Sequence, residues 1–451
     1  MGLDRRFHWD YEIVSDDENL FQKVRKERLV RQANHHHHYI GSLMAAVTTP
    51  PGFWQLDPSI IFLNHGSFGS CPKPVLDFQQ AIRERIEHQP VQFLVRELES
   101  LWDAARTVLA SFVGADAHDL VFVQNATTGV NAVLRSLQFM PGDELLVTDH
   151  EYNACLNALD FIAEKSGAKV VVAPVPFPVR SADEISAAIL ACVTERTRLA
   201  LLDHVTSQTA LIFPVEQIIR DLSARGVETL IDGAHAPGMV PLQLNTLGAT
   251  YYTGNCHKWI CAPKGAGFLW VRADRQESIR PLTISHGANS PRQDRSRFLL
   301  EFGWMGTGDP SAWLAVPEAL RVIGSLASEG WPGVLRHNHE LALAGRTILC
   351  NALNIQTPCP DELIGSMASM PLPTNSKPTL LRSPLYRDPL QDLLRERHGI
   401  EVPIIPWPNQ PDPSMARPRL LRISAQRYNS IEHYEHLARA LNMELIDGRK
   451  V

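Results

Sequence analysis

The feature that most constrains the fold is a regular alternation of short apolar segments with longer amphipathic segments. Residues 120–124 and 197–205 are short and apolar, which is typical of buried strands. Residues 153–167 and 215–226 repeat their apolar side chains at helical spacing. Strands that alternate with helices of this length predict βαβ units on a mostly parallel, twisted sheet. An α/β fold is therefore expected, with ligands bound at the carboxyl ends of the strands.

Differences in composition along the chain divide its 451 residues into four regions. Residues 1–43 are charged, contain the run His35–His38 and lack an apolar period, which favours a disordered extension over a metal-binding tract. Residues 44–78 are expected to pack with the smaller domain. Residues 79–310 are expected to form the large domain with a doubly wound sheet, and residues 311–451 a smaller α+β domain.

Two further expectations concern the C-terminal part of the chain. Residues 309–327 repeat apolar side chains at helical spacing and predict one long helix. Residues 357–378 contain several prolines among polar residues and predict a mobile surface connection.

The overall composition excludes several classes of protein. The chain is 44% apolar and 20% charged, which is typical of globular proteins, and its net charge of -6 without a basic stripe argues against nucleic-acid binding. No apolar run approaches the roughly 20 residues needed to cross a bilayer, and no secretory signal follows Met1. The seven cysteines are scattered and form no C-x-x-C pair, so reduced thiols and no metal site are expected. These observations predict a cytoplasmic protein without a membrane partner.

A polar turn follows the strand predicted at residues 120–124. It reads Asn125-Ala126-Thr127-Thr128-Gly129 and precedes a helical pattern. Free N–H groups and the positive end of the helix dipole can bind a phosphate there, with the threonine hydroxyls as extra donors. The same residues also suit an ordinary helix N-cap. Neither a Walker loop nor a G-x-G-x-x-G fingerprint is present.

Two charged residues stand in apolar surroundings further along the chain. Asp232 ends an apolar strand pattern, where a carboxylate is costly unless a cation holds it ionised or it caps a helix. Lys258 lies between a histidine and a tryptophan in the stretch GNCHKWICAPKGAGF. A buried lysine has a lowered pKa and can form a Schiff base, although a lysine beside tryptophan can also snorkel to water.

The anion-binding turn, the carboxylate and the amine occur in that order on one predicted sheet. Pyridoxal 5'-phosphate requires this set, because its phosphate must be held, its pyridine nitrogen kept protonated, and its aldehyde bound by a lysine. The combination therefore predicts a pyridoxal-phosphate site, which none of the three elements predicts by itself.

Eight ordered motifs carry a resemblance that extends from about residue 61 to residue 441. The sequence resembles fold-type I pyridoxal-phosphate enzymes of the class V aminotransferase family, and within it the isopenicillin N epimerase group. The motifs are FLNHGSFG (62–69), NATTGVN (125–131), HEYNA (150–154), DHVTS (203–207), DGAHAPG (232–238), GNCHKW (254–259), GTGDPSAW (306–313) and RISAQRYN (422–429).

The resemblance implies roles for the cofactor-binding residues. Lys258 would be the Schiff-base lysine and the proton shuttle at the substrate Cα. Asp232 would pair with the pyridine nitrogen, His235 would lie near the ring oxygen, and Tyr152 would stack on the ring. The phosphate would be held by four residues: Thr127, Thr128, Asn255 and His257. The two histidines could instead be satisfied polar groups beside the sheet, and Tyr152 could belong to the core.

Further residues are implied at the substrate and at a subunit boundary. Ser207 would be a polar contact to the cofactor, and Thr307 would reach the phosphate of a neighbouring subunit, which implies a homodimer. Arg422 would bind the substrate α-carboxylate through its two-pronged guanidinium, unless it forms a surface ion pair. Asn64 and His65 would line the substrate entrance.

Departures from the family pattern restrict the reaction. The desulfurase branch needs a cysteine shortly before Arg422, and residues 399–414 contain none. Gly308 stands where the epimerase group often has an arginine, which weakens the case for isopenicillin N as the substrate. Epimerisation, with Tyr152 as the acid on the second face, is ranked first, followed by transamination or C–S lysis. An inactive partner subunit is disfavoured by the complete Lys258, Asp232 and Arg422 set, and a nucleotide-binding oxidoreductase lacks its glycine fingerprint.

Overall fold

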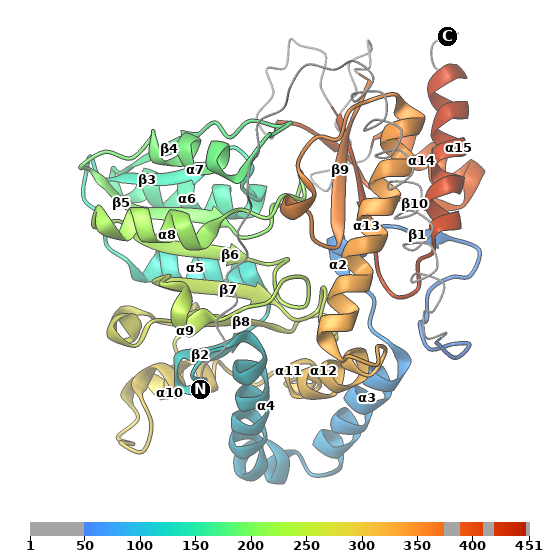
Figure 1. Ribbon diagram of the computed structural model, residues 1–451. Coiled ribbons are helices and arrows are strands. Elements are labelled where there is room, and N and C mark those ends of the chain that lie inside the picture. The colour runs from blue at the N-terminus through green and yellow to red at the C-terminus, as the bar shows by residue number, and fades with distance from the viewer. Residues whose placement is uncertain (1–48, 374–387, 409–418, 448–451) are drawn as a thin grey trace, which may run out of the picture. The chain divides into compact units, whose positions relative to one another are not determined.

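A seven-stranded sheet forms the larger part of the fold (Figure 1). The computed structural model describes residues 49–373, 388–408 and 419–447, and the predicted extension 1–43 lies outside these ranges. The strands, in spatial order, are β2 (Leu120–Val123), β8 (Gly267–Val271), β7 (Tyr251–Asn255), β6 (Glu228–Gly233), β5 (Thr197–Asp203), β3 (Glu144–Thr148) and β4 (Lys169–Ala173).

The sheet is parallel except for β8, which runs antiparallel to both β2 and β7. Right-handed crossovers run one way along the sheet through α5 (Ala126–Ser136) and α6 (Asn153–Ser166). They return through α7 (Ala182–Leu190) and α8 (Val215–Ala224), so the two helix pairs cover opposite faces. The predicted α/β fold with a doubly wound sheet is therefore confirmed.

The apolar character of the central strands follows from burial on both faces. Every residue of β2, β7 and β8 is buried, and side chains of α5 and α6 pack against the sheet in one continuous core. The sequence pattern did not predict β7 and β8: threonine, glycine and asparagine end the apolar run of β7, whereas β8 is a short apolar run that was not assigned.

A smaller antiparallel sheet lies in the C-terminal part, in the order β11 (Ile404–Pro406), β12 (Arg419–Ser424) and β9 (Met367–Leu372). Its helices are α13 (Trp331–Leu353), α14 (Pro389–His398) and α15 (Ile431–Asp447). Strand β1 (Ile61–Phe62) pairs in parallel with β10 (Ile400–Glu401), so the N-terminal segment joins this part of the fold. A smaller C-terminal domain was predicted, and its exact boundary at residue 311 stays a prediction.

Two predictions for the C-terminal part are wrong. The expected mobile connection at 357–378 contains the buried strand β9, which pairs along its whole length with β12. The expected long helix is divided into α11 (Ser311–Leu314) and α12 (Val316–Gly324). Pro317 lacks an N–H and clashes with the preceding turn, so the first helix stops and a new one begins.

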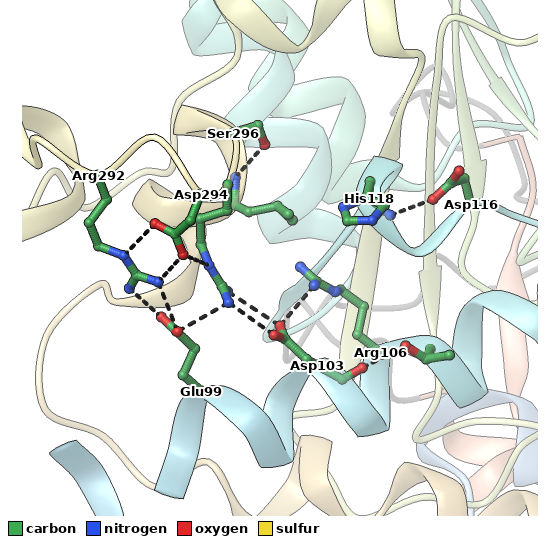
Figure 2. Close-up of polar contacts among 11 residues, drawn as sticks. Glu99, Asp103, Arg106, Asp116, His118, Arg292, Asp294 and Ser296 are labelled. Atoms are coloured by element: carbon green, nitrogen blue, oxygen red, sulfur yellow. Dashed lines mark hydrogen bonds and ion pairs between the residues drawn. The ribbon is translucent and has the colours of Figure 1, made fainter. Parts of the chain in front are cut away.

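The remaining helices lie before the sheet and beside it: α2 (His65–Phe68), α3 (Lys73–His88), α4 (Leu98–Val113), α9 (Leu244–Leu247) and α10 (Arg297–Gly303). Figure 2 shows an ionic network that joins α4 to the segment before α10. Arg292 binds both Glu99 and Asp294, and Asp103 of α4 accepts from Arg106. Arg295 also binds Glu99 and Asp103, so the network holds the segment before α10 against α4. No helix among the described residues is long and apolar enough to cross a membrane.

Candidate active site

The carboxyl ends of β2, β6 and β7 lie at one edge of the sheet, because these three strands run in the same direction. The turn at Asn125 follows β2, Asp232 lies on β6, and Lys258 follows β7 by three residues. The direction that β2, β6 and β7 share thus brings the turn at Asn125 together with Asp232 and Lys258, which lie more than a hundred residues later in the sequence.

Lys258 lies in the connection between β7 and β8, with its amine buried against His235. The Nζ of Lys258 and the Nε2 of His235 are 2.9 Å apart, and the indole Nε1 of Trp259 lies 3.4 Å from His235 Nδ1. An indole N–H can only donate, so Nδ1 accepts and the ring proton resides on Nε2. Nε2 then donates to Lys258, and this arrangement favours the neutral form of the amine.

The electrostatics of this pair agree with the hydrogen bonds. Burial lowers the pKa of Lys258 to about 8, although the Asp232 carboxylate opposes the shift. Burial and the nearby Lys258 charge lower the pKa of His235 well below its ordinary value, so the ring stays neutral. A neutral amine at this position is a competent nucleophile and proton acceptor.

Asp232 is fully enclosed, and its carboxylate accepts from the N–H of Ala234 at 2.8 Å and the thiol of Cys155 at 3.1 Å. Burial raises its pKa, while Ala234, Cys155 and Lys258 oppose that shift. A cationic group bound beside Asp232 would be strongly stabilised. It would supply a counter-charge to the buried carboxylate and so offset the cost of removing that carboxylate from water.

The sequence did not single out two further carboxylates in this region. Glu151 and Asp203 are both buried, and burial raises the pKa of each well above its ordinary value. One carboxylate oxygen of Glu151, the Sγ of Cys155 and one carboxylate oxygen of Asp232 lie within 4.8 Å of one another. Carboxyl groups this close in a buried site cannot all be ionised, so they share protons. Both residues belong to motifs that carried the family resemblance, but no local pattern indicated their burial.

The turn after β2 is fixed by side chains on both sides. Asn125 caps α5 by accepting from the Thr128 N–H at 2.9 Å, and the Asn255 side-chain oxygen accepts from the Ala126 N–H at 2.8 Å. The backbone N–H of Thr127 has no protein partner among the described residues. The Thr127 N–H lies at the N-terminus of α5, which is the positive end of the helix dipole. The half-buried Thr127 and Thr128 hydroxyls lie beside it.

His257 and Gly69 hold the lysine connection in place. The His257 ring bonds to the Ala266 carbonyl at 2.9 Å, and burial lowers its pKa to about 4. Gly69 has φ +70°, and a Cβ there would lie 2.2 Å from the His257 carbonyl oxygen. Only glycine therefore allows this close approach to the lysine backbone.

A cavity of about 420 Å³ opens in front of Lys258. Arg422 of β12 lines it and donates to the Ser207 carbonyl at 2.5 Å and the Ser67 hydroxyl at 2.8 Å. The guanidinium forms no ion pair among the described residues, and its Nε–H has no partner there. Burial lowers the Arg422 pKa to about 10, so it stays charged at neutral pH. The predicted residues Tyr152, Asn64 and Ser207 line the same cavity.

His65 and Thr307 are among the predicted residues that do not line this cavity. His65 is fully buried, and its ring bonds to the Tyr428 hydroxyl at 2.8 Å and the Lys258 carbonyl at 3.0 Å. It therefore supports the lysine backbone, and its predicted place at the substrate entrance stays a prediction. Thr307 is exposed on the loop between α10 and α11 and does not line the cavity of its own chain.

Comparisons with known proteins agree with this geometry. The chain matches the family Aminotransferase class-V over residues 71–373. It is 35% identical over 401 residues to isopenicillin N epimerase of Amycolatopsis lactamdurans, covering 86% of this chain and 96% of that one. It is 32% identical over 420 residues to a probable chloroplastic L-cysteine desulfhydrase of Arabidopsis thaliana, covering 88% and 86%. A solved structure of the cystine C–S lyase C-DES has a TM-score of 0.69 at 21% identity, covering 85% of this chain and 98% of that one.

The fold is that of fold-type I pyridoxal-phosphate enzymes. The chain belongs to the class V aminotransferase family, and the resemblance inferred from the motifs is confirmed. The cofactor of this family is pyridoxal 5'-phosphate, and the residues present fit it. The Lys258 amine, with its lowered pKa, suits the aldehyde of the cofactor, the enclosed Asp232 suits its pyridine nitrogen, and the Thr127 N–H suits its phosphate.

Proposed function

We propose that this enzyme removes the Cα proton of an amino acid and acts as an amino-acid epimerase. The observation that carries the proposal is the shared cavity of Lys258 and Arg422, which places the lysine amine and a guanidinium whose Nε–H has no partner among the described residues before one substrate. A relative 35% identical is named isopenicillin N epimerase, which supports the reaction class.

In this proposal each side chain has a separate role. Arg422, whose Nε–H has no partner among the described residues, binds the α-carboxylate and so orients the Cα–H bond. The bound cofactor supplies an electron sink for the pair left at Cα. Lys258 accepts the proton at its Nζ, and Asp232 holds a proton on the pyridine nitrogen. Tyr152, which is 39% exposed and lines the same cavity, donates a proton from the second face.

A second candidate is C–S lysis of a cysteine-like substrate. Relatives named L-cysteine desulfhydrase support it, and the reaction needs Lys258 but no acid on the second face. None of the seven cysteines lines the described cavity, so a persulfide on the enzyme is not part of this candidate.

We also propose that the protein is a homodimer in which Thr307 reaches the partner's phosphate. The exposed position of Thr307, outside its own chain's cavity, supports this arrangement. Sedimentation of the holoenzyme, with Thr307→Ala compared for cofactor affinity, tests it. A monomer of full activity would refute the proposal.

Amino acids in deuterated water distinguish the reactions. Deuterium entry with inversion at Cα, followed by NMR and chiral chromatography, is expected for an epimerase. Release of pyruvate and a thiol would establish the lyase instead, and release of a keto acid the transaminase. Lys258→Ala should abolish Cα exchange and the covalent link to the cofactor that borohydride reduces in the wild type. Exchange by that variant at the wild-type rate would refute the role of Lys258.

A further inference from the structure

A second cavity of about 410 Å³ adjoins the one in front of Lys258. Asn64, Phe68 and Glu401 line both cavities, so the two spaces meet at these side chains. Phe68 is 61% exposed and lies at this junction. A substrate held at Arg422 could therefore extend its side chain toward the second cavity.

The charges differ between the two ends of this combined space. Near the reacting carbon the described lining carries the cations Lys258 and Arg422. The second cavity carries two carboxylates, Glu401 at the junction and Asp57 beyond it, and one cation, Arg395. Arg395 binds Glu401 at 3.2 Å, whereas Asp57 accepts from the N–H and the hydroxyl of Ser59. The described lining of this cavity thus holds two carboxylates and one guanidinium, which leaves a net negative charge.

The Gln391 amide lies beside this negative charge and is held by two hydrogen bonds. Gln391 donates its amide N–H to Glu401 at 3.3 Å, and its amide oxygen accepts from the Ile404 N–H at 3.2 Å. The Gln391 amide is thereby fixed, and it cannot turn both of its donors toward a ligand. An incoming carboxylate would meet Glu401 with no unshared cation beside it in the described lining.

We propose that this distal wall selects amino acids whose side chains end in an uncharged hydrogen-bond donor or a cation, such as an amide or an ammonium, and excludes a distal carboxylate. This inference rests on the proposed function, since it assumes that Arg422 binds the α-carboxylate. Glu401 is the main specificity-determining residue, and Asp57 adds to its field.

Two pairs of ligands of matched size test the inference on the holoenzyme: glutamine with glutamate, and lysine with 2-aminoadipate. Cα exchange in deuterated water gives kcat/KM, and calorimetry gives Kd independently of turnover. We expect the wild type to favour the first member of each pair by about tenfold or more, because like charges are placed side by side. Glu401→Gln should raise kcat/KM for glutamate about fivefold or more and change that for glutamine less than about twofold.

The control and the second variant isolate the charge at this site. Glu329→Gln removes an exposed carboxylate that is likewise bound to an arginine, Arg336, but lies outside both cavities, so the preference should not change. Asp57→Asn should weaken the preference less than Glu401→Gln does, and thermal unfolding checks that each variant folds.

The outcomes separate this inference from the proposed function. Equal use of glutamine and glutamate by the wild type would overturn the inference while leaving Cα chemistry intact. If no amino acid exchanges its Cα proton, the proposed function fails, and the Kd ratios still decide the inference. Absence of binding by every ligand would overturn both.

Discussion

Replacing Trp259 by phenylalanine should raise the pKa of Lys258 in the apoenzyme. The Trp259 N–H requires His235 Nδ1 to accept, so the ring proton on Nε2 faces the lysine and favours its neutral form. Without the indole donor the ring can adopt the other tautomer, and the Lys258 ammonium can then donate to Nε2. Such a hydrogen bond favours the charged form by about 1.4 kcal/mol, which equals about one pKa unit.

The size of the effect follows from the starting value. With a pKa of about 8, about 9% of Lys258 is neutral at pH 7. With a pKa of about 9 this fraction falls to about 1%. The rate at which the apoenzyme binds pyridoxal 5'-phosphate covalently should therefore fall about tenfold at pH 7 and match the wild type above about pH 10.

The assay follows visible absorbance after mixing apoenzyme and cofactor between pH 6.5 and pH 10.5. Trp270→Phe is the matched control, because Trp270 is also buried and its indole N–H has no partner among the described residues. Both variants lose buried volume, but only Trp259→Phe should move the inflection. Inflections that coincide within about 0.3 pH unit would refute the tautomer argument.

The remaining predictions concern substrate, cofactor and stability. Arg422→Lys should lower kcat/KM about ten- to hundredfold, mainly through KM, because an ammonium cannot reproduce the guanidinium fork; steady-state kinetics measures it. Asp232→Asn should weaken cofactor binding about tenfold or more in equilibrium dialysis, because the charge opposite the pyridine nitrogen is lost. Burial lowers the pKa of His65 to about 3 and that of His150 to about 4, so both stay neutral when folded but take up protons when unfolded. Stability should therefore fall as pH drops below about 6.5, by up to about 1.4 kcal/mol per pH unit for each ring, in urea denaturation.

Each of these predictions has a contrary result. An unchanged KM in Arg422→Lys would show that the carboxylate binds elsewhere. Tight cofactor binding by Asp232→Asn would show that the carboxylate is not needed for affinity. An unfolding free energy that is constant between pH 7.5 and pH 5 would contradict the neutral, buried histidines.

The sequence predicted which residues lie at the edge of the sheet better than it predicted their hydrogen bonds and burial. Asp232 and Lys258 stood out because charges in apolar surroundings need a physical reason, and parallel strands bring such residues to one edge. The tautomer of His235 was not predictable, since it depends on a contact between neighbouring turns that no spacing encodes. Glu151 and Asp203 were missed for a similar reason, because the burial of their carboxylates results from tertiary packing.

The small sheet shows another limit of pattern reasoning. Strand β9 contains methionine, alanine, serine and proline, which have little preference for strands, and its pairing with β12 over a long sequence separation decides its conformation. Arg422 lies on that partner strand, so its distance to Lys258 could not be obtained from either local sequence.

The origin of the side chains around the cavity has a consequence for how such enzymes diversify. The groups that suit the cofactor all come from the stretch between Asn125 and Lys258, on the large sheet. The groups that face the substrate's far end come from the N-terminal segment at Asp57 and from α14 and β10 near Glu401. Mutation in the second set can alter which amino acid is accepted without disturbing the first. Ancestral chains with one catalytic core could thus acquire new substrates through mutations around the second cavity. Exchanging these segments between relatives would be a practical route to new specificities.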